Sequence, residues 1–156
     1  DLDAIERIEL ENFSEEEAIA REILKDHIEK IQTTFLVAEC QGQILGYLEG
    51  PVRPERYLID SSFSEVEDLS QLEQGFISIT SLSIAKEAQG LGVGTLLLEA
   101  MKEIALKDNR QGINLTCHDY LIPYYEKQGF TNEGRSESQY AGEVWYNLVW
   151  ENENLD

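Results

Sequence analysis

The segment from residue 82 to residue 95 constrains this chain more than any other. It reads Leu-Ser-Ile-Ala-Lys-Glu-Ala-Gln-Gly-Leu-Gly-Val-Gly-Thr, so an apolar strand leads into the alternate glycines Gly90, Gly92 and Gly94. Glycine lets the backbone turn sharply and approach a ligand closely, because no Cβ intervenes. An amphipathic helix follows, and the free amides at its start favour a phosphate. The segment therefore predicts a site for a ligand that carries a diphosphate.

Three kinds of phosphate-binding loop compete for this segment, and residue spacing separates them. A P-loop needs a lysine after its second glycine, but Lys86 precedes the glycines. A dinucleotide-binding turn needs a third glycine where Thr95 stands. The remaining pattern, Gln/Arg-x-x-Gly-x-Gly/Ala, is matched by Gln89, Gly92 and Gly94. Here the segment resembles the loop that holds the pyrophosphate of coenzyme A in the GNAT superfamily of N-acetyltransferases. A glycine-rich turn without a ligand is the alternative.

A second motif strengthens the resemblance. Residues 117–130 read Cys-His-Asp-Tyr-Leu-Ile-Pro-Tyr-Tyr-Glu-Lys-Gln-Gly-Phe, and Tyr125, Gly129 and Phe130 match the family's Tyr-x-x-x-Gly-Phe element. The surrounding Cys-x-Asp-x-Leu-Ile-Pro-Tyr-Tyr-Glu is similar to the arylalkylamine (serotonin) N-acetyltransferase branch. The likeness rests on motifs over residues 76–150 and on element order before them.

The resemblance implies acetyl-CoA as the cofactor and assigns two groups of residues to its binding. The strand before the glycines would pair with the pantetheine arm, and the amide near Leu82 would stabilise the oxyanion of the reacting carbonyl. The glycine loop would hold the diphosphate. The residues concerned are Leu82, Ser83, Ile84, Gln89, Gly90, Leu91, Gly92, Val93, Gly94 and Thr95.

The transfer also needs an acid and a base. A phenol, with an ordinary pKa of about 10, suits late protonation of the leaving thiolate. The resemblance gives this role to Tyr125, although the neighbouring Tyr124 offers the same chemistry. The arylalkylamine branch uses a pair of histidines as the base, and Ser78 and Thr80 stand at the matching positions. Hydroxyls are poor bases, so the general base is left open.

The chain has two histidines. His118 follows a predicted strand, where an imidazole titrating near neutrality either serves the chemistry or lies exposed at the strand end. His27 falls on a predicted helix and is expected to face solvent. Asp119 is expected to cap the helix that follows it.

Other candidates for the acceptor site are expected to have structural or surface roles. Aromatic residues scattered along a chain are usually core, and we place five of them there: Phe13, Tyr57, Phe63, Tyr140 and Trp145. Carboxylates of the polar segment 53–75 would suit an ammonium, but a run of charges is more typical of a solvated surface. The candidates are Asp60, Glu65 and Glu67.

Composition narrows the function classes. The 156 residues suit one domain, and the net charge of −19 repels nucleic acid and anionic lipid while it attracts cationic amines. No apolar run approaches the length of a membrane helix, so we expect a soluble, cytoplasmic protein without membrane contact. Cys40 and Cys117 are too few for a disulfide framework or a zinc site, and no metal is expected.

Hydrophobic periodicity predicts the order of elements. We expect helices over residues 1–12, from Ser14 (a capping box with Glu17) to Ile31, from 93 to about 108, and over 124–128. Strands are expected over 34–39, 43–49, 76–84, 113–117, 131–136 and 144–150, and the tail 151–156 should fray. This order predicts an α/β (α+β) domain whose mixed, mostly antiparallel sheet is flanked by helices. It is similar to the GNAT acyl-CoA N-acyltransferase fold, whose additional first strand would precede Asp1.

These observations predict one acetyl-CoA-dependent N-acetyltransferase domain over residues 1–156. The expected acceptor is a small primary amine, an arylalkylamine or a polyamine, attacked directly. A protein amino terminus or lysine is an alternative acceptor, and a catalytically silent acyl-CoA-binding regulator is an alternative from another class. A homodimer is left open.

Overall fold

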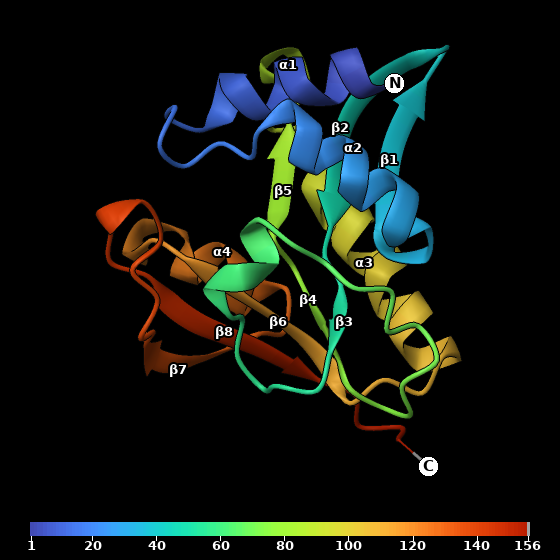
Figure 1. The fold of residues 1–156 in the computed structure, drawn as a ribbon, viewed down its shortest axis with the longest axis vertical. Coiled ribbons are helices and arrows are strands. Elements are labelled where there is room, and N and C mark those ends of the chain that lie inside the picture. Colours follow the sequence, from blue (N-terminus) through green and yellow to red (C-terminus); the bar gives the residue numbers. More distant parts are fainter. Residues whose placement is uncertain (156) are drawn as a thin grey trace.

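The computed structural model describes residues 1–155 and arranges them as two sheets with helices packed against them (Figure 1). The α-helices are α1 (Leu2–Asn12), α2 (Arg21–Lys30), α3 (Val93–Lys107) and α4 (Ile122–Lys127). The strands are β1 (Phe35–Cys40), β2 (Gln43–Glu49), β3 (Val52–Arg53), β4 (Phe76–Ser78), β5 (Ser81–Ile84), β6 (Gly112–Cys117), β7 (Thr131–Arg135) and β8 (Tyr146–Glu151). The predicted mixed, mostly antiparallel architecture flanked by helices is confirmed.

The two sheets meet where one predicted strand breaks into two. The order of the first sheet is β1-β2-β5, all antiparallel, and that of the second is β3-β4-β6-β8-β7, in which β4 and β6 are parallel. Residues 76–84 were expected to form one strand. Instead, the amide of Ile79 still bonds to Asn114 O on β6, whereas the amide of Thr80 bonds to Glu49 O on β2, each at 2.8 Å. The chain therefore passes from one sheet to the other at these two residues.

The neighbouring strands make the same crossing, and a glycine permits it. Between β2 and β3, Gly50 lies so close to β4 that an added Cβ would sit 1.9 Å from Ser78 O. Pro51 follows, and its carbonyl accepts the amide of Ser78 at 2.8 Å. Because β5 leaves with β2 and β6 stays with β4, β5 and β6 diverge, and space opens between them.

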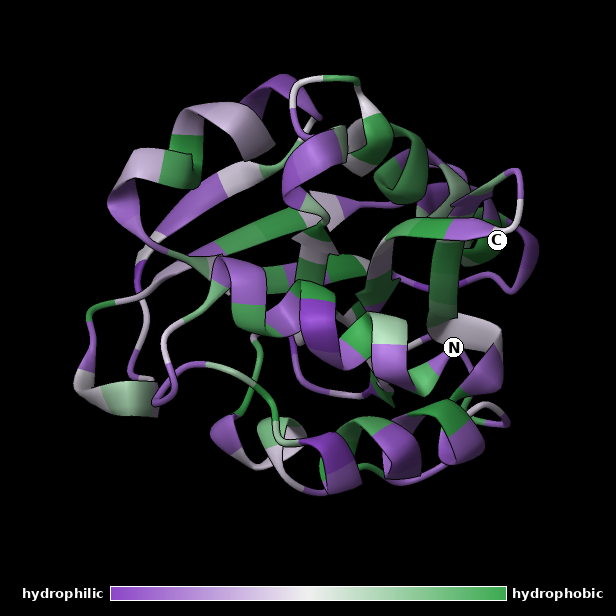
Figure 2. Cartoon of the chain, turned by 90° about the horizontal axis from the view of Figure 1, so that it is seen from above, coloured by the Kyte–Doolittle hydropathy of each residue, from purple (hydrophilic) through white to green (hydrophobic). Residues whose placement is uncertain are grey.

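Two apolar clusters hold the fold together. The larger one packs α3 against both sheets around Leu98, Met101, Ile77 and Leu148. The smaller one packs α1 and α2 on the three-stranded sheet around Ile5, Ile8, Leu24 and Tyr47. In Figure 2, the outer helices carry both hydrophilic and hydrophobic stretches, as expected of helices with one buried face. Among residues 1–155, no helix is long and apolar enough to cross a membrane.

Two expected element boundaries were wrong. The second helix begins at Arg21, because the predicted capping pair closes an isolated turn in which the amide of Glu17 bonds to Ser14 Oγ at 3.3 Å. The tail was expected to fray from residue 151, but β8 extends to Glu151, and Asn152 Nδ2 bonds to Arg110 O at 2.9 Å. Residue 156 lies outside the described part of the chain.

Candidate active site

The glycine loop forms the floor of an open cleft. Gly90 (φ +80°) and Gly92 (φ +83°) take the left-handed conformation that glycine favours. At both positions an added Cβ would meet no atom of residues 1–155 within 4 Å, chain neighbours aside. Gly92 is the N-cap of α3 and brings no capping side chain, so within residues 1–155 the first amides of this helix are unpaired donors beside the cleft. A cradle of this kind suits a phosphate.

The third glycine serves packing. Gly94 has an ordinary helical conformation, and an added Cβ would lie 2.6 Å from Tyr124 Oη. Its missing side chain therefore lets α3 approach α4 closely. Gly90 and Gly92 thus serve the turn, and Gly94 serves the contact between α3 and α4.

The cleft has a volume of about 620 Å³ and contains most of the predicted coenzyme residues. Those that line it are Leu82, Ile84, Gln89, Gly90, Gly92, Val93, Gly94 and Thr95. Two predicted residues point elsewhere: Ser83 is buried with its hydroxyl 3.3 Å from Ile8 O, and the Leu91 side chain is exposed to solvent. Either could still contribute backbone groups to a ligand.

Residues of α1 hold the loop in place, and sequence reasoning missed them. Asn12 Nδ2 donates to Ile84 O at 2.8 Å and to Ser83 Oγ at 3.1 Å. Gln89 Nε2 donates to Asn12 Oδ1 at 2.8 Å and to Ile84 O at 3.1 Å. Gln89 therefore fixes the turn between β5 and the glycines. Asn12 lies far from both motifs in sequence, and no local pattern identifies it.

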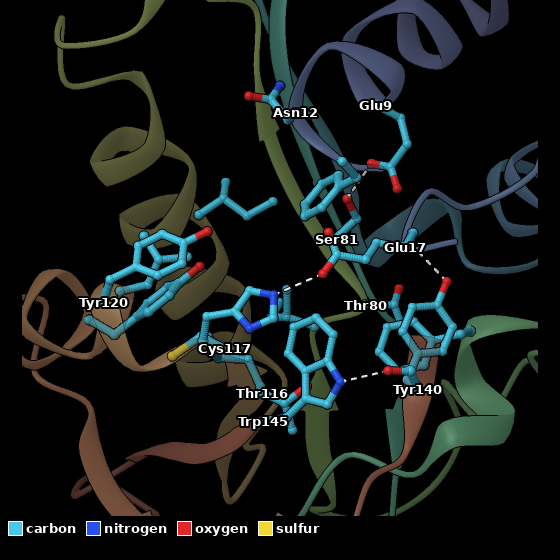
Figure 3. A pocket seen from close by; sticks show the side chains of 18 residues that line it. Glu9, Asn12, Glu17, Thr80, Ser81, Thr116, Cys117, Tyr120, Tyr140 and Trp145 are labelled. Carbon is cyan, nitrogen blue, oxygen red and sulfur yellow. Dashed lines mark hydrogen bonds and ion pairs between the residues drawn. The ribbon is translucent and has the colours of Figure 1, made fainter. Parts of the chain in front are cut away.

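A second, smaller cavity of about 110 Å³ lies between the diverging strands β5 and β6 (Figure 3). Four of the aromatic residues assigned to the core line it: Phe13, Phe63, Tyr140 and Trp145. Trp145 is buried, as expected of a core residue, but Phe13, Phe63 and Tyr140 are only partly buried, so the core assignment was wrong for these three. Chain segments far apart in sequence bring the four rings together. The fifth, Tyr57, is exposed, contrary to the core assignment, and donates to Glu133 at 2.7 Å.

Two short 3₁₀ helices, η2 (Asp60–Phe63) and η5 (Tyr140–Gly142), close one side of the cavity. The Phe63 and Tyr140 rings stack with centroids 4.0 Å apart. Tyr140 Oη donates to Glu17 O at 2.8 Å, and Trp145 Nε1 donates to Tyr140 O at 2.8 Å; both bonds are drawn in Figure 3. Asp60 bonds to Ser138 and the amide of Gln139, so it ties η2 to the segment before η5.

The other acidic candidates of the 53–75 segment do not reach this cavity. Glu65 and Glu67 line a separate surface cleft beside Lys30 and Arg53. Negative charge near the cavity comes instead from Glu9 and Glu17, which precede the first sheet.

Tyr125 lies in the wall between the cleft and the cavity and lines both. Its side chain is buried and contacts the rings of Tyr124 and Phe130 at right-angled geometry. Burial, followed by Cys117 and Tyr124, raises the pKa of Tyr125 well above its ordinary value. The expected phenol of pKa about 10 is thus a weaker acid, and it stays protonated at every physiological pH.

A buried carboxylate supports β5 beside the cavity. Glu9 Oε1 accepts the hydroxyls of Tyr47 and Ser81, and Oε2 accepts the amide of Ile19 at 2.9 Å. Burial is the main cause that raises the pKa of Glu9, and the nearby Glu49 adds to it, while the three hydrogen bonds oppose the shift. The apolar stripe of α1 predicted the helix but not this carboxylate on its buried face.

The two histidines occupy unexpected environments. His27 was expected to face solvent, but it is fully buried, and its Nδ1 lies 2.9 Å from Glu49 Oε2. His118 lines the cavity, with Nε2 2.8 Å from Glu17 Oε2 and its ring stacked on Trp145 at 4.2 Å between centroids. It is therefore not a free strand-end residue.

The other three candidates, Ser78, Thr80 and Asp119, have structural surroundings in the fold. Thr80 lines the cavity and its hydroxyl donates to Glu49 O at 3.2 Å, whereas Ser78 is buried outside the cavity lining. Asp119 was expected to cap the next helix, but Leu121 is the N-cap of α4, and within residues 1–155 no side chain bonds to the first amides of this helix. That expectation was wrong.

The small cavity and the open cleft share Tyr125 in their lining, and comparison with known proteins decides the family. The model of the acetyltransferase (GNAT) family matches residues 2–130. The chain belongs to this family. Its members use acetyl-CoA, which fits a cleft with two open left-handed glycines at a helix start.

Two relatives give similar sequence matches. The chain is 29% identical over 110 residues to an N-alpha-acetyltransferase of Sulfurisphaera tokodaii, covering 67% of this chain and 60% of that protein. It is also 29% identical over 102 residues to an uncharacterized N-acetyltransferase of Methanocaldococcus jannaschii, covering 65% of this chain and 51% of that protein. The chain therefore spans little more than half the length of these relatives.

Solved structures confirm the GNAT fold. The loading GNATL domain of CurA from Lyngbya majuscula has a TM-score of 0.75 at 16% identity, covering 97% of this chain and 92% of that domain. Ard1 from Thermoplasma volcanium has a TM-score of 0.71 at 16% identity, covering 95% and 88%. At these identities the likeness concerns the fold alone.

Proposed function

We propose that this GNAT chain transfers the acetyl group of acetyl-CoA to a small primary amine by direct attack. One observation carries the proposal: Tyr125 lies in the wall shared by the phosphate-cradling cleft and the small aromatic cavity. An acid at that position lies beside the path of an acetyl group that passes from the cleft to the cavity. The cleft would then hold the coenzyme and the cavity the acceptor.

The residues of the cleft fit the coenzyme in two stretches. The amides after Gly92 would receive the diphosphate, because they are unpaired and lie at the positive end of α3. The backbone of residues 82–84 would receive the pantetheine arm, because β5 pairs with β2 along one edge and its residues Leu82 and Ile84 line the cleft on the other side. The amide near Leu82 would donate to the oxygen on which charge develops.

Acetyl-CoA supplies a thioester carbon at which a C–N bond forms as the C–S bond breaks. The phenol of Tyr125 then gives its proton to the departing sulfur. The raised pKa of Tyr125 keeps the phenol protonated. The same buried environment makes a thiolate a stronger base than it is in water. Burial therefore raises the proton affinity of both the phenol and the leaving thiolate, so the proton can still pass from Tyr125 to the sulfur.

The cavity favours an ammonium joined to a compact apolar body. Aromatic faces attract cations, and the rings of Phe63, Tyr140 and Trp145 surround the space. The carboxylates of Glu9 and Glu17 add negative potential. A cavity of about 110 Å³ is of the order that holds one aromatic ring, since an engineered cavity of roughly 150 Å³ binds benzene. These features support an arylalkylamine over a long polyamine.

A protein amino terminus is the second candidate, and the name of the Sulfurisphaera relative favours it. Such a substrate would place its first residue in the cavity, and the rest of the polypeptide would have to leave past η2 and η5. Ser138 donates to Asp60 of η2, and Tyr140 of η5 donates to Glu17 O between α1 and α2. These bonds hold the two turns in place and favour a small molecule.

A panel of acceptors tests the proposal. Acetyl-CoA turnover is followed by thiol release and by product mass with 2-phenylethylamine, spermidine and a decapeptide with a free amino terminus. We expect the highest kcat/KM with 2-phenylethylamine. Turnover confined to the peptide would support the second candidate. Calorimetric binding of acetyl-CoA without turnover of any acceptor would indicate a silent acyl-CoA-binding regulator, and absence of binding would contradict both.

A further inference from the structure

An amine reaches its enzyme largely as the ammonium ion, and it must lose a proton before it can attack. The expected histidine pair on the long strand is replaced by Ser78 and Thr80, which leaves this step without a base. The inference that follows rests on the proposed amine acetylation. It concerns which group of the acceptor cavity takes the proton.

Most titratable groups of the cavity stay protonated. Burial raises the pKa of the Cys117 thiol to about 12, with Asp119 adding to it. Burial also raises the pKa of the Tyr140 phenol to about 12, and that of Tyr125 further. These groups can donate protons, but at neutral pH they accept none.

Of the carboxylates, Glu9 is fully engaged. Its Oε1 receives two hydroxyls and its Oε2 receives an amide, and the side chain is only 1% exposed. These three bonds hold the carboxylate on donors of the protein itself. Glu17 is partly exposed, and its Oε2 already faces His118.

His118 has the geometry of an oriented base. Its Nε2 lies 2.8 Å from Glu17 Oε2, so the neutral ring carries its proton on Nε2 and donates it to the carboxylate. Stacking on Trp145 at 4.2 Å fixes the plane of the ring. Among residues 1–155, Nδ1 has no hydrogen-bond partner. The ring lines the same cavity as the aromatic walls that would hold the amine.

We propose that His118 is the general base for the acceptor amine and that Glu17 is the residue that orients it. The ammonium gives its proton to Nδ1, and the freed nitrogen lone pair forms the C–N bond. The C–S electrons leave on sulfur, which takes the proton of Tyr125. The acetylated nitrogen then gives its second proton, through water, to the phenolate of Tyr125, and the imidazolium, stabilised by Glu17, releases its proton to solvent.

Several charged or titratable groups surround the imidazole. Glu17 approaches from the segment between α1 and α2, and Glu9 lines the same cavity from α1. Cys117 and Asp119 are its chain neighbours, Tyr120 stacks against it at 5.7 Å, and Tyr140 bonds to the backbone of Glu17. Of these, Glu17 alone bonds to the ring.

The test is the pH profile of kcat/KM with 2-phenylethylamine as the probe. His118→Gln keeps a donor toward Glu17 but cannot accept the proton, so we expect about a 100-fold loss at pH 7. We also expect the acidic limb of the wild-type profile to disappear. His27→Gln is the matched control, because the chain has two histidines and His27 lies in the buried core. This control should lower the melting temperature and keep the acidic limb.

Glu17→Gln separates orientation from mere structure. It keeps a hydrogen bond to the ring but removes the negative charge that stabilises the imidazolium, so kcat should fall several-fold while the KM for the amine changes little. A merely structural tether would leave kcat unchanged. Affinity for coenzyme A, measured by calorimetry, should be unchanged in both cavity variants.

The outcomes distinguish this inference from the function on which it rests. If the wild type acetylates no amine, the proposed function fails and the base with it. If the wild type is active and folded His118→Gln keeps the acidic limb, the base assignment alone is overturned. A wild-type kcat in folded Glu17→Gln would overturn the orienting role of Glu17.

Discussion

At the scale of single residues, burial decides the chemistry that each side chain can perform. Tyr125 shows this most clearly, because its phenol is enclosed by Tyr124, Phe130 and the end of β6. A solvent-exposed phenol begins to lose its proton near pH 10, whereas this one keeps it. Under the proposed transfer, Tyr125 is a proton donor over the whole range in which the protein is folded and soluble.

Replacing the phenol tests this role directly. Tyr125→Phe should lower kcat about 100-fold, since general acid catalysis commonly contributes 10²–10⁴-fold, and should leave the affinity for coenzyme A within a factor of two. Thiol-release assays measure kcat, and calorimetry measures the affinity for coenzyme A. Tyr124→Phe is the matched control and should retain most of the activity. Equal losses in both variants would remove Tyr125 from its role.

Glu9 makes a prediction about stability and pH. Because the pKa of Glu9 is raised in the folded protein, the folded state holds a proton that the unfolded chain has lost above pH 4.5. This contribution to stability is complete below that pH and is lost as pH rises through the folded-state pKa. The loss is about 1.4 kcal/mol for every pH unit between the two pKa values.

The comparison with Glu9→Gln isolates this contribution. We expect the unfolding free energy of the wild type, minus that of the variant, to fall as the pH rises above 4.5 in urea titrations. Other carboxylates titrate in the same range, but they do so in both proteins and cancel in the difference. A difference that stays flat or grows with pH would contradict the raised pKa.

The sequence predicted the part of the candidate site that local patterns encode. Tyr125 and the glycines stand at fixed spacing within short motifs, so they were found without a structure. Glu9, Asn12 and Glu17 come from the first 20 residues and reach the site only through the packing of α1 on β5. Their roles depend on tertiary contacts, and the helical pattern that surrounds them carries no sign of those contacts.

At the scale of elements, the divergence of β5 from β6 creates the site. The strand pattern over residues 76–84 is consistent with one continuous strand, because the alternation of side chains does not change at the crossing. The strand is divided because its neighbour also changes sheet: Gly50 and Pro51 lead from β2 in the first sheet to β3 in the second. Sequence periodicity predicts which residues are extended, but it does not assign them to one sheet or another.

The glycine turn gives an element-scale prediction with a close control. Gly92 and Gly42 have nearly the same positive φ, +83° and +79°, and both would place an added Cβ in open space. Replacement of either by Ala should cost about 1–2 kcal/mol of stability, because of the left-handed backbone. Only Gly92→Ala should also weaken coenzyme A binding, by at least tenfold in calorimetry. Equal affinities in the two variants would place the diphosphate elsewhere.

At the scale of the whole molecule, the net charge of −19 acts oppositely on the two proposed substrates. A cationic amine is drawn to the protein, whereas the anionic coenzyme must overcome long-range repulsion through local amide dipoles. Dissolved salt screens both effects, because the screening length falls to about 8 Å at physiological ionic strength.

This opposition predicts salt effects of opposite sign. Between 20 mM and 300 mM NaCl, the KM for 2-phenylethylamine should rise several-fold while the KM for acetyl-CoA falls. Initial-rate measurements with one substrate varied at a time provide both values. The two signs control for each other, since a general effect of salt on the enzyme would move both constants in the same direction.

The burial of Cys117 has a consequence for kinetic order. With its pKa raised to about 12, this cavity thiol is almost never a thiolate at neutral pH, so it makes a poor nucleophile. Cys117 would then not carry the acetyl group as an intermediate, and we expect donor and acceptor to be bound together. Double-reciprocal plots should accordingly intersect instead of running parallel, and no burst of free coenzyme should appear before the amine is added.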